Sequence, residues 1–450
     1  MLNYSRLHQL KSKEIIYLVT KQLPKIESPK KSIIKNQSQS IKKVSVSTTP
    51  TSQSASSEPH QNHKVDLELN KTEVGKVFDS YSGNYNGDRA IMNHLGLDIG
   101  TKNVVLSFKD STGKVNFLRE LNGYYIFQKP SKFIENMLNN AGIKRSDGTE
   151  RPAKWIKLPG TDSPIVLGAD AEELAYANND TLRRPMAEGG VTSDDESLAV
   201  LASIVQGLIE AAEKEYGKFD TKVHVCYCTT AKAINRSSNI DFHKKVVDLI
   251  LSGYETKSKV TYSSIPESQA IVLKESPDGT GIGLSWGAGT VTVSYVKWGQ
   301  EIYSFCWVGS GDWIDSQVAM LHGYNIDNPA IKSRETPTTV SRRKHTIDLT
   351  PGKEPSDRVG LDIMLNYRVL IENVVNGIIQ GFVDNESAAR IDGGINIYMA
   401  GGTSSPPGFE QRVALAFKDA KCPFEIAKIH KSENPLFAVA EGCLIASEMQ

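Results

Sequence analysis

Apolar and polar residues alternate with two distinct periods along the chain from Leu95 onward. In residues 94–108 and 282–296 apolar side chains recur at every second position, which predicts strands. In residues 198–216 and 361–383 they recur at spacings of three and four, which predicts amphipathic helices. Strand-like and helix-like stretches interleave, and this order is typical of an α/β protein.

Shorter stretches of the same two kinds complete the predicted fold. Residues 331–360 are polar and broken by prolines, so we expect a small insertion there. Residues 395–400 predict a buried strand that ends in Gly401 and Gly402, ahead of a helix beginning near Phe409. Further strands are expected at 115–127, 222–228 and 302–308, and a further helix at 243–251.

The N-terminal part of the chain has a different composition. Residues from about 26 to 90 are rich in Ser, Lys, Gln, Thr and Pro, and they have too few apolar residues to offset the chain entropy lost on folding. We therefore predict a disordered, basic tail over residues 1–90, with a short helix possible at 2–23. The tail is either an inert leader or a tether to an acidic partner or an anionic membrane.

Charge and cysteine content narrow the function classes. The chain has 52 Lys and Arg and 52 Asp and Glu, so the part that follows the basic tail is mildly acidic. Such a body is not expected to bind nucleic acid. The five cysteines show no metal or disulfide spacing, and Cys226 and Cys228 are predicted to be buried in a strand. With no apolar run of about 20 residues, we expect a cytoplasmic protein.

An internal repeat indicates how the fold is built. Residues 96–108 align without a gap over residues 283–295, with matches at Gly100/Gly287, Val104/Val291 and Ser107/Ser294. Each copy reads as a strand, a glycine-rich turn and a second strand, which is the pattern of a β-hairpin. Two such hairpins far apart in the sequence predict two similar lobes, each presenting one turn. Two unrelated tight turns are the alternative, which the ungapped match disfavours.

The composition of the two turns suits phosphate binding. Glycine permits positive φ and close approach of the backbone, so that successive N–H groups can surround an anion. Thr101 and Thr290 add hydroxyl donors, and Lys102 adds a positive charge. Two opposed turns of this kind predict a site for one polyphosphate between the lobes.

These motifs resemble those of the actin-type ATPase superfamily, which includes actin, MreB, ParM and the DnaK-type chaperones. The first and second phosphate motifs correspond to residues 98–103 and 285–290, and the adenosine motif to 399–403. The two connecting segments correspond to residues 265–270 and 435–442. Two further stretches, 184–190 and 309–312, are similar to MreB, and the Pro266-Glu267-Ser268 sequence is similar to ParM.

The resemblance implies a two-lobed, duplicated ribonuclease H-like fold. A first lobe is expected at residues 91–280, with a variable small subdomain at about 121–195. A second lobe is expected at 281–450, with its insertion at about 331–360. The final helix is expected to pack back onto the first lobe.

The resemblance also implies the site and its ligands, ATP and Mg²⁺. Asp98 is expected to hold Mg²⁺ through water, with Ser285 as a second possible contact, and Glu267 to orient the attacking water. Nucleotide contacts are expected from Gly100, Thr101, Lys102, Asn103, Gly287, Ala288, Gly289, Thr290, Lys332, Gly401, Gly402 and Thr403.

Simpler interpretations of the same residues remain open. Asp98 can cap a turn, Glu267 can be an ordinary acid in the first turn of a helix, and Gly401-Gly402 can be a strand-ending turn. The second phosphate motif of the superfamily normally has Asp where this chain has Ser285. The lost charge predicts slow or absent ATP hydrolysis, since each ~1.4 kcal/mol of transition-state stabilisation is tenfold in rate.

The function expected from the resemblance is a self-assembling, nucleotide-dependent cytoskeletal filament. The alternative is a non-polymerising ATP-dependent switch, either regulatory or chaperone-like. A full DnaK-type chaperone is disfavoured, because no substrate-binding domain is expected after residue 442. A sugar kinase of the same superfamily needs an aspartate base, for which the sequence offers no candidate.

Overall fold

The computed structural model describes residues 90–450 apart from the gaps at 128–131, 142, 145–149, 152, 158–162, 179, 181, 236–239, 254–258, 327, 329–332 and 385–392. The described residues belong to one compact unit of the chain. The predicted tail, apart from residue 90, and its predicted helix at 2–23 lie outside the described residues.

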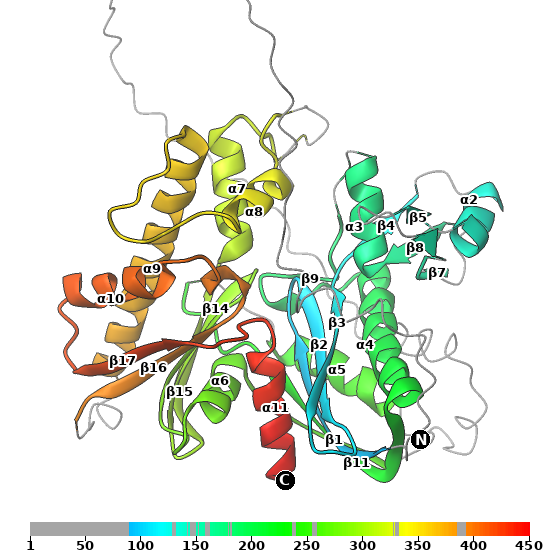
Figure 1. The fold of residues 1–450 in the computed structure, drawn as a ribbon, viewed down its shortest axis with the longest axis horizontal. Coiled ribbons are helices and arrows are strands. Elements are labelled where there is room, and N and C mark those ends of the chain that lie inside the picture. The colour runs from blue at the N-terminus through cyan, green and yellow to red at the C-terminus, as the bar shows by residue number, and fades with distance from the viewer. Residues whose placement is uncertain are drawn as a thin grey trace, which may run out of the picture. The chain divides into compact units, whose positions relative to one another are not determined.

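The first lobe is built on a five-stranded sheet with the order β12-β11-β1-β2-β3 (Figure 1). β11 is parallel to β1 and β12, while β2 is antiparallel to β1 and β3. Helices α4 and α5 pack against this sheet. The elements are β1 (Ala90–Ile99), β2 (Asn103–Lys109), β3 (Val115–Leu121), α4 (Asp195–Glu215), β11 (Gly217–Thr229), α5 (Ile240–Ser252) and β12 (Lys259–Pro266).

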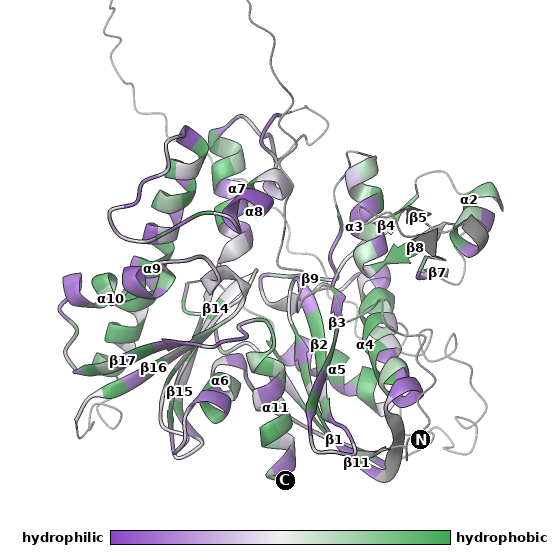
Figure 2. Cartoon of the chain, in the orientation of Figure 1, coloured by the Kyte–Doolittle hydropathy of each residue, from purple (hydrophilic) through white to green (hydrophobic). Residues whose placement is uncertain are grey.

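The strand predicted at 115–127 is divided into two strands, Val115–Leu121 and Tyr124–Ile126, whereas two other predicted elements of this lobe begin earlier than expected. The helix predicted at 198–216 is α4, which begins at Asp195 because the Asp194 carboxylate caps the Ser197 amide. Its hydrophobic and hydrophilic positions lie on different sides, and the former face the sheet (Figure 2). The strand predicted at 222–228 is part of the longer β11, in which Cys226 and Cys228 are buried as predicted.

Smaller elements branch from the first lobe between β3 and α4. They form a three-stranded sheet with the order β4-β8-β7 and two short hairpins, β5–β6 and β9–β10. The elements are β4 (Tyr124–Ile126), α2 (Lys132–Asn136), the π-helix η2 (Met137–Ala141), β5 (Ile143–Lys144), β6 (Glu150–Arg151), β7 (Trp155–Lys157), β8 (Pro164–Leu167), α3 (Gly168–Ala177), β9 (Met186–Ala187) and β10 (Gly190–Val191).

The second lobe repeats the five-stranded design with the order β15-β14-β13-β16-β17. One large hydrophobic core joins this sheet to helices α7 to α10. Its elements are β13 (Gly281–Trp286), β14 (Thr290–Lys297), β15 (Gln300–Val308), α7 (Gly311–Leu321), α8 (Pro337–Lys344), α9 (Arg358–Asp384), β16 (Ile395–Ala400), the 3-10 helix η3 (Gly402–Ser404), α10 (Phe409–Asp419) and β17 (Ile426–Lys431). The described part of the predicted insertion includes α8, which packs on α7 and α9.

Two helices are exchanged between the lobes. Helix α6 (Glu267–Glu275) follows β12 of the first lobe but packs on β13 and β14 of the second. Helix α11 (Ala438–Glu448) follows β17 of the second lobe but packs on β1 of the first, and α6 and α11 contact each other (Figure 1). The exchange links both sheets through one pair of helices.

The repeated glycine and serine positions explain this close packing. A Cβ at Gly96 would lie 2.2 Å from the Ala440 carbonyl oxygen of α11, and one at Gly283 would lie 1.9 Å from that of Ser268 in α6. The Ser107 hydroxyl donates to the Ala440 carbonyl at 2.7 Å, and the Ser294 hydroxyl lies 2.7 Å from that of Ser268. Each hairpin therefore packs closely against the helix that crosses from the other lobe.

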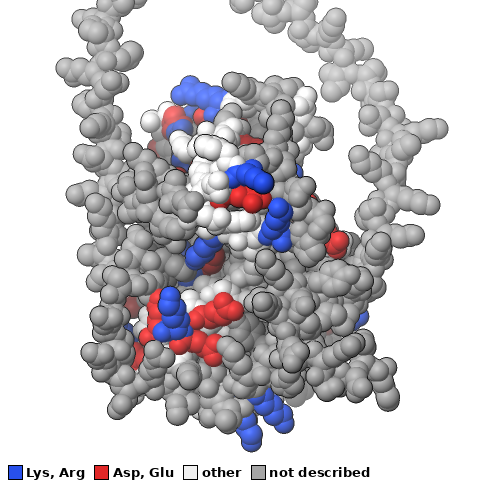
Figure 3. All heavy atoms as spheres, turned by 90° about the vertical axis from the view of Figure 1, so that its right-hand side faces the viewer, with Lys and Arg blue, Asp and Glu red and all other residues white. Residues whose placement is uncertain are grey.

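On the face drawn in Figure 3, acidic and basic side chains lie among one another. No helix among the described residues is long and apolar enough to span a membrane.

Candidate functional site

The two glycine-rich turns meet in one cleft, with a cavity volume of about 320 Å³. A Cβ at Gly289 would lie 2.7 Å from the Thr101 hydroxyl, so the turns are in direct contact. Of the site residues predicted from the sequence, the cleft is lined by Asp98, Gly100, Thr101, Lys102, Asn103, Glu267, Ser285, Gly287, Ala288, Gly289, Thr290, Gly401, Gly402 and Thr403. The remaining one, Lys332, lies outside the described residues.

The two turns have the same internal hydrogen bond. The Gly100 amide donates to the Asn103 carbonyl at 2.9 Å, and the matched Gly287 amide donates to the Thr290 carbonyl at 2.9 Å. This shared closure leaves Thr101 and Lys102 at the tip of the first turn. Their counterparts at the tip of the second are Ala288 and Gly289. Only the first turn therefore carries a charged side chain.

Two acids lie below the turns, of which Glu267 is buried and Asp98 is half-buried. Asp98 is next to the last residue of β1, and Glu267 is the first residue of α6. Burial raises the pKa of both carboxyl groups, and the charge of Asp98 raises the pKa of Glu267 further. Hydrogen bonds from Cys228 to Asp98, and from Ser285 and Thr292 to Glu267, lower the two pKa values in part. The Cys228 thiol donates to Asp98 at 3.1 Å, and Ser285 hydrogen-bonds to Glu267. An ordinary first-turn acid faces solvent, whereas the Glu267 side chain is buried and lines the cleft.

This donor set fits a magnesium–phosphate complex. Carboxylate and hydroxyl oxygens are hard donors of the kind Mg²⁺ prefers, and a cation beside these two acids would offset the repulsion between their charges. Within the described part of the chain, no three His, Cys, Asp or Glu side chains form a ready metal cluster. A cation here would complete its shell with water and phosphate oxygens, as Mg²⁺ commonly does.

The turn after β16 closes the cleft on the second lobe. Gly401 has φ of 96°, and a Cβ there would lie 2.3 Å from the Trp286 carbonyl oxygen. Only glycine fits this position. The Thr403 hydroxyl donates to the Gly287 carbonyl at 2.7 Å, so this turn also supports the second phosphate turn. The large Trp286 side chain points away from the cleft and is packed against Phe409.

Lys344 is a cleft residue that the sequence did not reveal. It ends α8, lies buried, forms an ion pair with the Asp315 carboxylate at 2.7 Å and donates to the Gly311 carbonyl at 2.6 Å. Helix α8 begins with a capping box at Thr336 and has a basic last turn. That start and stop pattern is the sequence signal that could have placed a lysine here.

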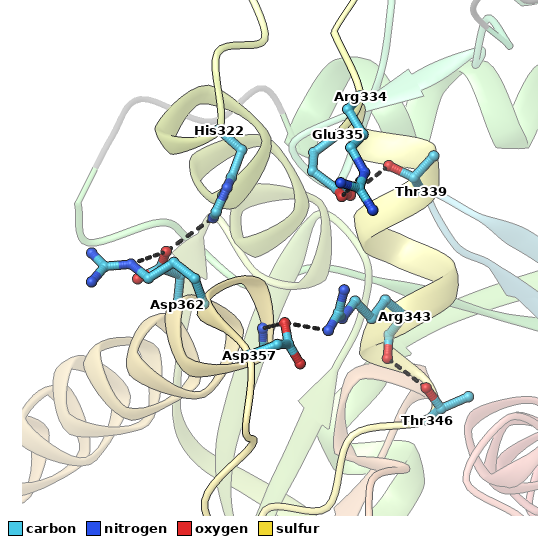
Figure 4. Close-up of polar contacts among 10 residues, drawn as sticks. His322, Arg334, Glu335, Thr339, Arg343, Thr346, Asp357 and Asp362 are labelled. Atoms are coloured by element: carbon cyan, nitrogen blue, oxygen red, sulfur yellow. Dashed lines mark hydrogen bonds and ion pairs between the residues drawn. The ribbon is translucent and has the colours of Figure 1, made fainter. Parts of the chain in front are cut away.

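Helix α8 is held firmly by its neighbours in the second lobe (Figure 4). Arg343 forms an ion pair with Asp357, whose carboxylate also accepts from the Gly360 amide at the start of α9. Nearby, the His322 ring lies 3.0 Å from Asp362 and so links the end of α7 to α9. These contacts hold α8 in place beside the cleft.

Three side-chain contacts cross the cleft from α7 and α8 to the first lobe. Arg184 pairs with Asp312 at 2.5 Å, and Lys102 reaches the Ser341 hydroxyl at 3.5 Å. The Arg342 guanidinium lies 4.3 Å from the ring centroid of Tyr176. Arg184 and Asp312 belong to the two stretches similar to MreB, and the structure brings these stretches together.

Two lobes on matched five-stranded sheets, exchanged helices and opposed turns define the actin-like ATPase fold. The solved structure described as "MamK double helical filament" shares it with a TM-score of 0.53, at 16% identity, over 79% of this chain and 98% of that chain. This likeness confirms the fold class predicted from the sequence.

Within that class, the chain belongs to the Volactin family, whose profile matches residues 92–447. The ethanolamine utilization protein EutJ from Carboxydothermus hydrogenoformans is also similar, with a TM-score of 0.44 at 14% identity over 79% of this chain and 92% of that chain. The structure of a non-polymerising MamK mutant bound to AMPPNP has a TM-score of 0.46 at 16% identity, over 80% of this chain and 100% of that chain. A search of curated proteins gives no significant match.

Proposed function

We propose that this protein binds ATP with Mg²⁺ in the cleft and that the bound nucleotide controls its assembly into cytoplasmic filaments. The observation that supports the proposal most is the contact between two matched glycine-rich turns beside the carboxyl groups of Asp98 and Glu267. Such turns present amide groups to an anion from two sides, and the carboxylates would bind the metal ion that accompanies the phosphates.

The roles of the cleft residues follow from their positions. Thr101, Lys102 and Asn103 would contact the terminal phosphates from the first lobe, and residues 287–290 would contact them from the second. Asp98 would anchor Mg²⁺, which neutralises phosphate charge. Gly401 and Gly402 let the backbone lie close to the nucleoside, and Lys344 is placed beside this turn, where a Cβ on Gly311 would meet both Lys344 and Thr403.

Hydrolysis is expected to be slow. Glu267 would orient the attacking water, but burial raises its pKa, so that a larger fraction of the carboxyl group is protonated near neutral pH. Ser285 contributes a hydrogen bond to Glu267 in place of the negative charge of an aspartate. Both features weaken the electrostatic stabilisation on which phosphoryl transfer depends.

Assembly is proposed from the shared fold and the cleft contacts. MamK, with the same fold, is described as a double helical filament. In our proposal ATP strengthens the three contacts across the cleft, and the closed form favours head-to-tail association of copies. The basic tail remains a candidate tether to an acidic partner or an anionic membrane.

The test is sedimentation of the full-length protein with Mg²⁺ and ATP, ADP or no nucleotide, together with calorimetric titration of ATP. We expect ATP to bind and to increase the pelleted fraction relative to ADP. ATP binding without pelleting at high protein concentration would support the alternative, a non-polymerising switch. Absence of ATP binding would reject both.

A further inference from the structure

The peptide carbonyl groups of both phosphate turns are held by hydrogen bonds, although different parts of the fold supply the donors. In the second turn, the Gly289 and Ala288 carbonyls accept from the amides of Gly309 and Asp312 at 2.9 and 2.8 Å. These amides lie at the start of α7. The Gly287 carbonyl accepts from the Thr403 hydroxyl at 2.7 Å.

In the first turn, one residue provides both of the corresponding bonds. The Asn122 side-chain amide donates to the Gly100 carbonyl at 2.8 Å. The Asn122 backbone amide donates to the Lys102 carbonyl at 2.8 Å. Asn122 lies in the turn after β3 and is fully buried, with 0% of its surface exposed. No group of the described residues donates to its Oδ1 atom, so burying this side chain costs free energy that its donor group offsets.

The direction of these carbonyls matters for an anion site. A carbonyl oxygen carries partial negative charge and repels a phosphate. In a planar trans peptide, the C=O of one residue and the N–H of the next point in opposite directions. Because the Gly100 and Lys102 carbonyls point to Asn122, the amides of Thr101 and Asn103 point away from it. Both of these residues line the cleft.

We propose that Asn122 is the positioning residue of the first phosphate turn, the counterpart of Thr403 and the start of α7 on the second. It fixes the peptide planes of residues 100–103 so that amides, and not carbonyls, are available to phosphate oxygens. The inference rests on the proposed nucleotide site and adds a residue that no phosphate motif of the sequence contains.

The experiment compares Asn122→Ala with wild type in binding to ATP, inorganic tripolyphosphate and adenosine, measured on the full chain by calorimetry and thermal shift. We expect the variant to bind ATP and tripolyphosphate about tenfold more weakly, the typical effect of one buried hydrogen bond. Binding of adenosine should stay within about twofold of wild type. Asn122→Asp keeps the size of the side chain without its donor. If Asn122→Ala does not fold, Asn122→Asp takes its place. We expect it to lose at least as much affinity for ATP and tripolyphosphate.

Asn235→Ala is the matched control. The Asn235 side chain also holds backbone, donating to the Val308 carbonyl at 2.8 Å and accepting from the Val308 amide at 2.9 Å, but it does not line the cleft. It should lower the melting temperature and leave the ratio of ATP to adenosine affinity unchanged. The inference is overturned if the Asn122 variants keep the wild-type ratio of ATP affinity to adenosine affinity, whether or not both affinities fall. If wild type binds no ATP, the proposed function itself fails.

Discussion

The two phosphate turns share a backbone but differ in the chemistry around them. The first lies above Asp98, carries Lys102 at its tip, and depends on the single residue Asn122 for support. The second has Ser285 in place of an acid, small residues at its tip, and support from α7 and Thr403. Under the proposed function, the duplicated hairpin would hold the phosphates from both lobes, while the acid that would anchor the metal ion belongs to the first phosphate motif alone.

The largest expected effect tests whether both hairpins need the exchanged helices. Gly96→Ala and Gly283→Ala each place a Cβ about 2 Å from a backbone atom of α11 or α6. Backbone cannot move aside as a side chain can, so each variant should lose about 4 kcal/mol or more of unfolding free energy, or fail to fold. Denaturant unfolding measures this.

Gly207→Ala is the control for these two variants. Gly207 lies within α4 with nothing within 4 Å of its Cβ position, so alanine there should stabilise the protein by about 0.5–1 kcal/mol. If Gly283→Ala were as stable as wild type, the close packing of α6 on β13 would be wrong.

Removing the charge of the first turn comes next. Asp98→Asn should weaken binding of Mg²⁺ and ATP about a thousandfold, roughly 4 kcal/mol, since the metal loses its anchoring carboxylate. The nucleotide-free variant should melt higher than wild type, because a partly desolvated charge that repels Glu267 is removed. Calorimetry measures the expected loss of affinity, and thermal melts measure the expected gain in stability.

The exposed turn acid Asp110 provides the control for Asp98. Its carboxylate accepts bonds from Thr112 within the β2–β3 turn, away from the cleft. Asp110→Asn should leave ATP affinity unchanged. Equal ATP affinity in Asp98→Asn and wild type would contradict the metal-anchoring role.

The sequence predicted the parts of this comparison that depend on local pattern. The ungapped repeat placed both hairpins, and the glycines at 100, 287 and 289 placed the turns within them. The donors that support the turns were not predictable, because Asn122 and Thr403 contact glycines that are distant in the sequence. Lys344 was missed for the same reason, since its role depends on how α8 packs against α7.

A third prediction concerns a buried histidine of the first lobe. Burial lowers the pKa of His243 in α5 to about 4, below its value of about 6.5 in an unfolded chain. Between these values the unfolded state binds a proton that the folded state excludes. The contribution of the neutral His243 to stability is therefore complete above about pH 6.5. It falls as the pH drops toward 4, by up to about 3 kcal/mol.

Urea unfolding of His243→Leu between pH 4 and 7 measures that contribution. The variant should show a shallower loss of stability with acid than wild type. Phe242→Leu, at the neighbouring buried position, should lower stability by a similar amount at every pH. Identical slopes for His243→Leu and wild type would show that this histidine does not drive the acid sensitivity.

The smallest expected effect concerns the second turn. Ser285→Asp restores a carboxylate there and should increase ATP hydrolysis about tenfold, roughly 1.4 kcal/mol. It should also lower the melting temperature of the nucleotide-free protein, because a third acid joins Asp98 and Glu267. Ser285→Asn, without the charge, should do neither. A phosphate-release assay that finds no gain would remove the explanation offered for slow turnover.

The most direct measurement is an experimental structure of the protein with Mg²⁺ and a non-hydrolysable ATP analogue. The account predicts the phosphate chain between residues 100–103 and 287–290, with the metal ion on the Asp98 side. A nucleotide bound outside the cleft, or contacted by only one of the two turns, would contradict it.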